Sequence, residues 1–192
     1  MLISSKKKFI FCHFSKVAGS SINDSLRKYA NVPWNRLYNY LYEYLGQQPA
    51  LGVYGRHIRP IELKPYLKES KFNTFFKFAF VRNPWDWHVS AYHYNLNDSN
   101  AVWHSIIKKK SFEEYLYWVI DNIEKVGAAQ YDFLSDGNGN LLVDYVGRFE
   151  ALHEDFKIIC KRINVRENLG KRNSSKRDRD YRKYYTPLHE NW

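Results

Sequence analysis

Two short apolar runs, residues 9–14 and 75–81, constrain the fold of this chain more than any other feature. Each run is long enough for a buried strand, and each ends in a polar loop after which the hydrophobic spacing becomes helical. The first loop spans Ser15 to Ser21, and the second contains Asn83 and Pro84, which can cap and begin a helix. Strands that lead directly into helices predict an α/β layered domain with a mostly parallel sheet.

Other patterns extend this expectation along the chain. Residues 34–45 have the spacing of an amphipathic helix, and Ser111 with Glu114 forms a capping-box pattern at the start of another. Residues 136–140 are dense in turn chemistry and predict a hairpin or a tight reversal between residues 131–134 and 141–146. Apolar spacing over 152–163 predicts the last helix. In the helix that begins at Pro84, the expected inward face is Val89, Tyr92, His93 and Leu96.

Charge and length set the class of protein. The formal net charge of +10 implies an anionic partner, and the excess is concentrated near the C-terminus, where Lys157 to Lys183 contains eleven Lys or Arg against three acids. Such a run is either a solvated basic face or a lid over phosphates. Because 192 residues with 44% hydrophobic content suit one core, we expect a single domain, residues 1–192, with a possible lid at about 164–192.

Membrane and metal signals are missing from the sequence. No run of eighteen apolar residues occurs, and the short run after the N-terminal lysines is too brief for a signal peptide, so we expect a cytoplasmic protein without a transmembrane segment. Cys12 and Cys160 lie in apolar segments rather than in a spaced framework, and therefore predict neither a zinc site nor a disulfide scaffold.

The loop from Phe14 to Ser21 has the composition of a phosphate cradle. Between a strand and a helix, backbone N–H groups and the positive end of the helix dipole point toward a bound anion. Gly19 permits close approach, and Ser20 and Ser21 add hydroxyl donors. The loop is not a Walker A motif, because Lys16 comes three residues before the only glycine. Taken alone, the pattern fits an ordinary strand-to-helix turn equally well.

The second loop offers an arginine and a serine. Arg82 follows the second strand, and Ser90 lies two turns into the helix, near the edge where open α/β sheets bind ligands. Arginine with serine suits a terminal phosphate. The alternative is that Arg82 is a structural ion-pair partner and Ser90 a small packing residue.

Together the two loops resemble the sulfotransferases that use 3′-phosphoadenosine 5′-phosphosulfate (PAPS), in the branch of carbohydrate sulfotransferases and their bacterial relatives. The resemblance continues through residues 143–150 and 173–185. It implies a P-loop-like three-layer fold, in which a central, mostly parallel sheet is flanked by helices. The residues that it implies for binding the 5′-phosphosulfate are Lys16, Val17, Ala18, Gly19, Ser20 and Ser21. Those that it implies for the 3′-phosphate are Arg82 and Ser90, with Ser175 and Lys176 in the closing segment.

The resemblance also implies a reaction. A sulfuryl group passes from PAPS to an acceptor hydroxyl, on a carbohydrate, by in-line displacement without a metal. Lys16 is the candidate to stabilise the leaving oxygen. His57, in a segment similar to the Gly-x-His element of related enzymes, is the candidate general base, and the alternative is a surface-loop histidine. His13, at the end of the first strand, is expected to pack beneath the loop.

Two rival functions belong to other classes. A P-loop nucleotide kinase or NTPase would need an acidic magnesium ligand at a strand end, whereas the second strand ends in Arg82. A non-catalytic nucleic-acid-binding module would explain the charge and the aromatic residues, but no nucleic-acid-binding motif is recognisable. No nucleic acid is therefore expected as a partner, and the sequence does not specify an oligomeric state.

Overall fold

The computed structural model describes residues 1–30, 57–65, 67–126, 129–170 and 177–185. The chain divides into two compact units. The first contains Met1–Val81 and Ala129–Arg172, and the second contains Arg82–Ala128 and Asn173–Trp192. The single domain expected from the sequence stays a prediction. The helix predicted over residues 34–45 lies outside the described residues.

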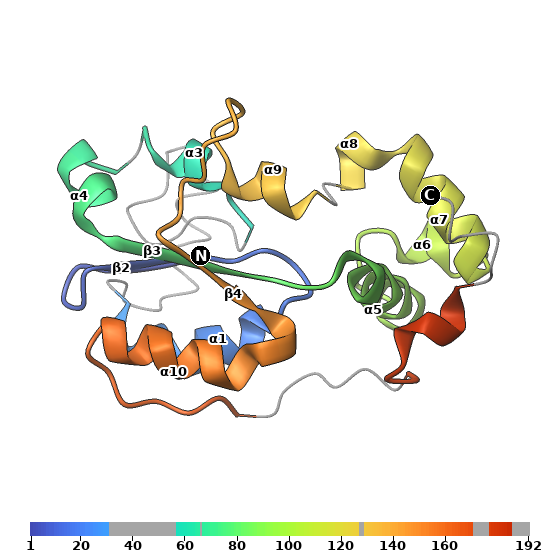
Figure 1. Ribbon diagram of the computed structural model, residues 1–192. Helices are drawn as coiled ribbons and strands as arrows, with labels where there is room; N and C mark the ends of the chain where they lie inside the picture. The colour runs from blue at the N-terminus through green and yellow to red at the C-terminus, as the bar shows by residue number, and fades with distance from the viewer. Residues whose placement is uncertain (31–56, 66, 127–128, 171–176, 186–192) are drawn as a thin grey trace. The chain divides into compact units, whose positions relative to one another are not determined.

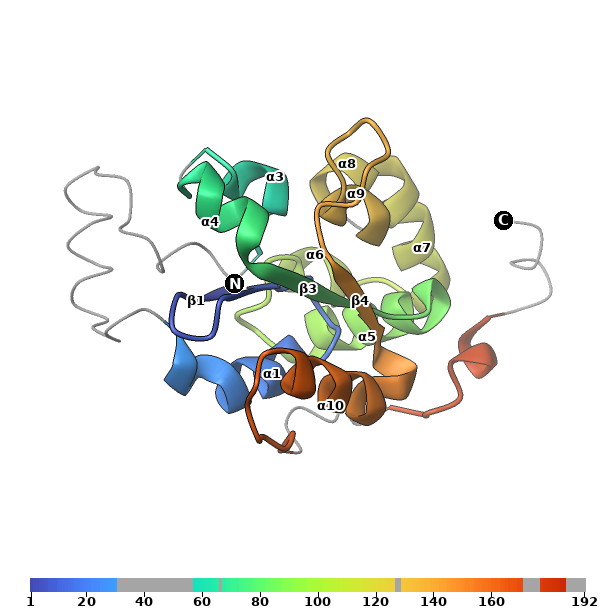
Figure 2. The ribbon, with the colours of Figure 1, turned by 60° about the vertical axis from the view of Figure 1, so that its left-hand side comes forward.

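The first unit is built on a four-stranded sheet in the order β1-β2-β3-β4. β1 (Leu2–Ser4) pairs antiparallel with β2 (Phe9–Cys12), whereas β3 (Phe76–Val81) pairs parallel with β2 and with β4 (Tyr145–Arg148). Helices α1 (Gly19–Leu26) and α10 (Leu152–Arg162) cover one face, as Figures 1 and 2 show. The other face is covered by α3 (Pro60–Leu63), α4 (Glu69–Thr74) and α9 (Gln130–Leu134). The predicted three-layer α/β fold with a mostly parallel sheet is confirmed.

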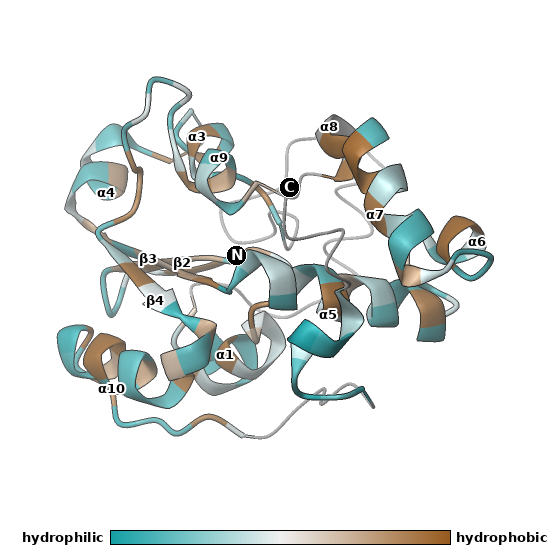
Figure 3. Ribbon diagram, turned by 45° about the vertical axis from the view of Figure 1, so that its right-hand side comes forward, coloured by the Kyte–Doolittle hydropathy of each residue, from teal (hydrophilic) through white to brown (hydrophobic). Residues whose placement is uncertain are grey.

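Both faces of the central strands are buried, which accounts for their almost uninterrupted hydrophobic sequence. Ile10, Cys12 and Ala79 belong to the core beneath α3, α4 and α9. Because side chains alternate along a strand, Phe11 and Phe78 point to the opposite face, where their rings stack with centroids 5.2 Å apart. Figure 3 shows the hydrophobic colour along β2 and β3 and mixed colours on the helices.

The pairing of β3 with β4 contains two unusual residues. Lys77 in β3 is buried, and its Nζ lies 2.9 Å from Oδ2 of Asp144, which precedes β4. The same Oδ2 accepts a hydrogen bond from the Lys77 backbone N–H at 2.7 Å. Further along, Gly147 lies opposite Phe80, and a Cβ atom at Gly147 would come within 2.6 Å of the Phe80 ring. Only glycine therefore fits that position without displacing Phe80.

Of the two alternatives predicted over residues 136–140, the tight reversal is confirmed and the hairpin between two strands is not. Oδ1 of Asp136 accepts hydrogen bonds from the backbone N–H groups of Asn138 and Asn140. Residues 130–134 form helix α9 instead of a strand. Helical spacing lets Leu134 join the core, while the Asp132 carbonyl accepts a hydrogen bond from Arg59 at 2.7 Å. Tertiary contacts of this kind override a short apolar pattern.

The second unit is helical among its described residues. It contains α5 (Pro84–Asn97), α6 (His104–Ile107), α7 (Phe112–Asp121), α8 (Ile123–Val126) and the 3₁₀ turn η3 (Tyr181–Tyr184). Asn83 caps α5 as predicted, and the capping box of Ser111 and Glu114 is confirmed at α7. No helix in the described ranges is long and apolar enough to cross a membrane.

The inward face of α5 differs from the prediction. Val89 is fully buried, but Tyr92, His93 and Leu96 are only half-buried. The buried positions also include Trp87 and Ala91 and three polar residues, Asp86, Ser90 and Asn95. The half-buried rings instead pack against other aromatic residues: Tyr92 lies edge-to-face on Phe112, and His93 lies edge-to-face on Tyr184.

Candidate active site

The loop between β2 and α1 has a strained backbone. Lys16 and Ala18 have φ angles of 62° and 63°, in the left-handed region that costs a non-glycine residue about 1–2 kcal/mol. Val17 between them is completely buried and anchors the loop. Strain of this kind persists only where packing imposes it, and it gathers at ligand-binding sites. Two left-handed non-glycine residues in one short loop are the kind of backbone outlier that motivates a ligand-binding hypothesis.

The start of α1 has the features of an anion site. Ala18 is the N-cap residue and makes no side-chain capping hydrogen bond to the first turn. The N–H groups of a helical first turn have no intrahelical partners, and the helix dipole places partial positive charge beside them. Gly19, Ser20 and Ser21 form this turn, with Ser20 half-buried and Ser21 buried. An anion that meets these N–H groups and hydroxyls would satisfy them.

His13 packs beneath the loop, as predicted. Its ring is 5% exposed and stacks on Phe11 with centroids 5.5 Å apart, while Nδ1 lies 3.3 Å from Nδ2 of Asn23. A Cβ atom at Gly19 would come within 1.6 Å of His13 Nε2. The sequence suggested that Gly19 lets a phosphate approach the backbone, but its packing on His13 is a further reason for glycine there.

His57 lies beside His13. Its Nδ1 is 3.1 Å from the His13 backbone carbonyl oxygen, and the two rings have centroids 4.7 Å apart. A carbonyl oxygen can only accept, so Nδ1 of His57 carries a proton and, in the neutral ring, Nε2 carries the lone pair. The His57 side chain is exposed. The first unit thus brings together the Lys16 loop, His13 and His57 at the carboxyl end of β2.

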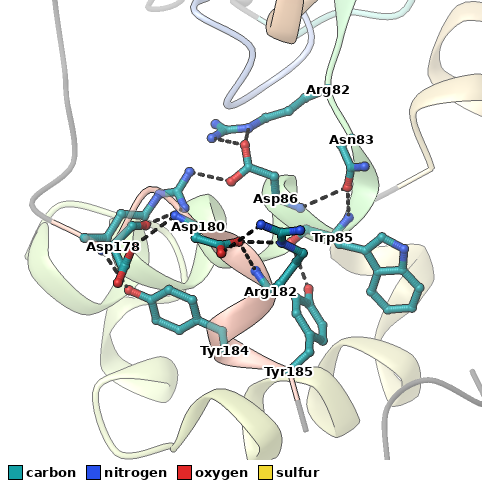
Figure 4. Close-up of polar contacts among 10 residues, drawn as sticks. Arg82, Asn83, Trp85, Asp86, Asp178, Asp180, Arg182, Tyr184 and Tyr185 are labelled. Carbon is teal, nitrogen blue, oxygen red and sulfur yellow. Dashed lines mark hydrogen bonds and ion pairs between the residues drawn. The ribbon is translucent and has the colours of Figure 1, made fainter. Parts of the chain in front are cut away.

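The second unit contains a buried cluster of charges around Asp86, shown in Figure 4. Nε and Nη2 of Arg82 lie 2.7 Å and 2.6 Å from Oδ2 of Asp86. Arg177 Nη2 lies 2.5 Å from the other oxygen, Oδ1. Arg82 therefore forms an ion pair, and it shares its carboxylate with a second arginine. Its predicted role toward a phosphate stays a prediction.

Ser90 is buried on α5, one turn after Asp86, on the same face of the helix. The second unit thus gathers Arg82, Asp86 and Ser90 at the first two turns of α5. Ser175 and Lys176 lie outside the described residues, as do Lys171 and Arg172. Burial, together with the charge of Arg177, lowers the pKa of His93.

Asp86 has no role among the residues predicted from the sequence, although its four-residue spacing from Arg82 is a signal for an ion pair. The contact between Asp86 and Arg177 joins residues 91 positions apart, and no local pattern predicts it.

Comparison with known proteins gives a consistent result. The family model described as "Sulfotransferase family" matches residues 1–191. An uncharacterized protein of Archaeoglobus fulgidus is 32% identical over 117 residues, which cover 58% of this chain and 87% of that protein. Carbohydrate sulfotransferase 9 of Homo sapiens is 24% identical over 196 residues, covering 87% of this chain and 41% of that protein. No solved structure matches. Since the family model covers nearly the whole chain, the protein belongs to the sulfotransferase family.

Proposed function

We propose that this sulfotransferase takes the sulfuryl group of PAPS and transfers it to a hydroxyl of a carbohydrate acceptor. PAPS is supported by two features suited to its two anionic ends, the strained loop of the first unit and the arginine cluster of the second. The carbohydrate acceptor is supported by the name of the human relative, carbohydrate sulfotransferase 9. Family membership favours this proposal over the nucleotide kinase and nucleic-acid-binding alternatives.

We assign a separate task to each of these two features. The loop of Lys16 to Ser21 binds the 5′-phosphosulfate through backbone N–H groups, the Ser20 and Ser21 hydroxyls and the Lys16 ammonium. Arg82 and Ser90 bind the 3′-phosphate through charge-assisted hydrogen bonds. Both tasks rest on donors, because the phosphosulfate anhydride and the ionised 3′-phosphate offer only acceptors.

The transfer itself needs a base and a group that stabilises the leaving oxygen. The acceptor oxygen attacks sulfur while its proton passes to Nε2 of His57, and the bond between sulfur and the bridging oxygen breaks to release 3′-phosphoadenosine 5′-phosphate (PAP). Lys16 stabilises the negative charge that develops on the bridging oxygen.

The observation that carries this assignment is the contact between His57 Nδ1 and the His13 carbonyl. It holds the exposed imidazole in the tautomer whose Nε2 can accept a proton, beside the loop that contains Lys16.

Calorimetric titration with PAP tests the proposal before the acceptor is known. We expect saturable, stoichiometric binding that is unchanged by EDTA. PAPS should then be converted to PAP in the presence of an acceptor polysaccharide, with sulfate appearing on the polysaccharide. Binding to oligonucleotides that PAP does not displace, or nucleotide binding that requires magnesium, would favour the rival functions instead.

A further inference from the structure

The first unit has a cavity of about 590 Å³ at the amino ends of β2 and β3. Its walls are the turn between β1 and β2, the last residues of α4 and the residues that end α10, which lie at the left-hand end of the sheet in Figure 1. The loop of Lys16 follows the opposite end of β2. Because β3 has six residues, its two ends are roughly 17 Å apart, and a small ligand in this cavity cannot reach that loop.

Basic side chains dominate the walls of the cavity. Four of the lining residues are basic and one is acidic: Lys6, Lys7, Lys8, Arg162 and Asp144. The carboxylate of Asp144 is already bound by the buried Lys77, whose ammonium and backbone N–H lie 2.9 Å and 2.7 Å from Oδ2. No described carboxylate pairs with Lys6, Lys8 or Arg162. The cavity therefore has an excess of positive charge.

Two of the four cations are fixed by other residues of the walls. The Lys7 ammonium donates to the Asn164 carbonyl at 2.6 Å and so joins the turn to the end of α10. The Arg162 guanidinium lies over the Phe76 ring, 5.4 Å from its centroid. A guanidinium on an aromatic face keeps its N–H donors in its own plane, at its edge, where they can meet an anion.

Lys8 has a backbone conformation that glycine adopts with less strain. Its φ is 51°, in the left-handed region, at the last position of the turn that joins β1 to β2. Hairpin turns favour glycine or asparagine at such positions. The Lys8 carbonyl accepts a hydrogen bond from the Phe76 N–H at 2.9 Å, a contact that any residue type could make. A lysine here therefore suggests a role for its side chain, which is exposed and lines the cavity.

The nearby helix ends account for only part of this charge. α4 and α10 both end at the cavity, and the negative end of a helix dipole attracts cations. This explains Arg162, in the last turn of α10, and Lys7, which binds a carbonyl there. It does not explain Lys6 and Lys8, whose ammonium groups have no hydrogen-bond acceptor within the described ranges.

The size and polarity of the cavity favour a small phosphorylated ligand. Its volume lies within the range of small-molecule sites, roughly 300–1,000 Å³. A phosphate group carries up to about two negative charges, so two such groups would balance the four cations. None of the large hydrophobic residues exposed in the described part of the chain lines the cavity, which therefore offers no platform for nucleic-acid bases to stack on.

We propose that this cavity is a second anion site, which binds a small molecule with two neighbouring phosphate groups. Lys6 and Lys8 supply ammonium groups, and Arg162 supplies a guanidinium that can bind two oxygens of one phosphate. The site lies at the opposite end of the sheet from the loop of Lys16, so it goes beyond the proposed transfer reaction. Its ligand need not displace PAPS from that loop.

Pyrophosphate is the probe, and calorimetry on the full chain in the presence of saturating PAP measures its affinity. Lys6→Gln and Lys8→Gly should each weaken pyrophosphate binding about 3- to 10-fold, and the double variant about 10- to 100-fold, while PAP affinity stays unchanged. Lys64→Gln is the matched control. It removes the same charge from an exposed residue at the end of α3, outside the cavity, and should change pyrophosphate affinity by less than about 2-fold.

Lys8→Gly also separates binding from structure. Glycine adopts a positive φ without strain, so this variant should melt no lower than the wild type while it loses affinity for pyrophosphate. A lower melting temperature would make Lys8 a structural residue and overturn its place in the site.

Three results of the titrations would overturn the inference. They are a wild-type protein that does not bind pyrophosphate while PAP is bound, complete displacement of pyrophosphate by PAP, and a loss with Lys64→Gln as large as that with Lys6→Gln. If PAP itself does not bind, the proposed function fails, and the same series with pyrophosphate alone decides this inference.

Discussion

Replacing Gly19 by alanine should destabilise the protein, although helix propensity predicts the reverse. Gly19 is the first residue of α1, and alanine is favoured over glycine by up to about 1 kcal/mol within a helix. The added Cβ would, however, lie 1.6 Å, 1.9 Å and 2.5 Å from three ring atoms of His13. That ring cannot retreat easily, because it is buried against Phe11 and contacts Asn23.

The size of the effect follows from overpacking. Forcing extra atoms into a packed site costs about 1–3 kcal/mol, which exceeds the gain in propensity. For a chain of this length the melting temperature should fall by roughly 2–12 °C. The displaced ring also lies under the loop, so PAP affinity should fall with stability. Thermal melting, urea denaturation and PAP titration measure these changes.

Two controls separate the clash from other effects of alanine. A Cβ at Gly170 would meet nothing within 4 Å, so Gly170→Ala should be nearly neutral. In a His13→Ala background the space is vacated, and Gly19→Ala should lose most of its penalty. A Gly19→Ala protein as stable as the wild type, or equally destabilised with and without the His13 ring, would refute the packing argument.

The remaining predictions concern the reaction, pH and a helix cap. Lys16→Ala should lower kcat by about 10²- to 10³-fold and PAP affinity much less, as single-turnover assays and calorimetry would show; equal losses would make Lys16 a ground-state anchor. His57→Ala should lower kcat about 10²- to 10⁴-fold and abolish the rise of turnover with pH that deprotonation of the base produces, which a pH–rate series would reveal. Burial lowers the pKa of His88 from 6.5 to about 4, so the unfolded chain binds a proton at a higher pH than the folded chain does. The free energy of unfolding should therefore fall by up to about 3 kcal/mol as the pH drops from 6.5 to 4. Urea titrations of His88→Gln should lack most of this pH dependence. Ser111→Ala removes the α7 cap and should cost about 1 kcal/mol, or roughly 2–4 °C in melting temperature, and an unchanged value would show that the capping box is dispensable.

The parts of the fold that the sequence predicted are those set by local chemistry. The strands β2 and β3, the Asn83 cap and the capping box at Ser111 each depend on residues within a few positions of one another. The placement of His13 beneath the loop was also predicted, from its position at the end of the first strand, directly before the loop. In α9 the local apolar pattern was the same for strand and helix, and the core decided between them.

The parts that were missed depend on contacts across the chain. The pairing of Asp86 with Arg177, and the closeness of His57 to the His13 carbonyl 44 residues away, follow from tertiary folding. The left-handed backbone of Lys16 and Ala18 has no signature in residue type, since neither residue favours it. Ligand sites commonly break local rules in this way, because surrounding packing sustains what sequence preference opposes.

The ion pair between the buried Lys77 and the exposed Asp144 has a consequence for how β4 pairs with β3. Parallel strands can slide along one another, and a shift of two residues would keep every side chain on its original face. Such a slip would separate the buried Lys77 ammonium from its carboxylate and would therefore destabilise the shifted register. It would also move a side chain larger than glycine opposite Phe80. The ion pair of Lys77 with Asp144 and the absence of a Cβ atom at Gly147 each favour the native register of β4 on β3. Intermediates with a shifted register should therefore be short-lived during folding.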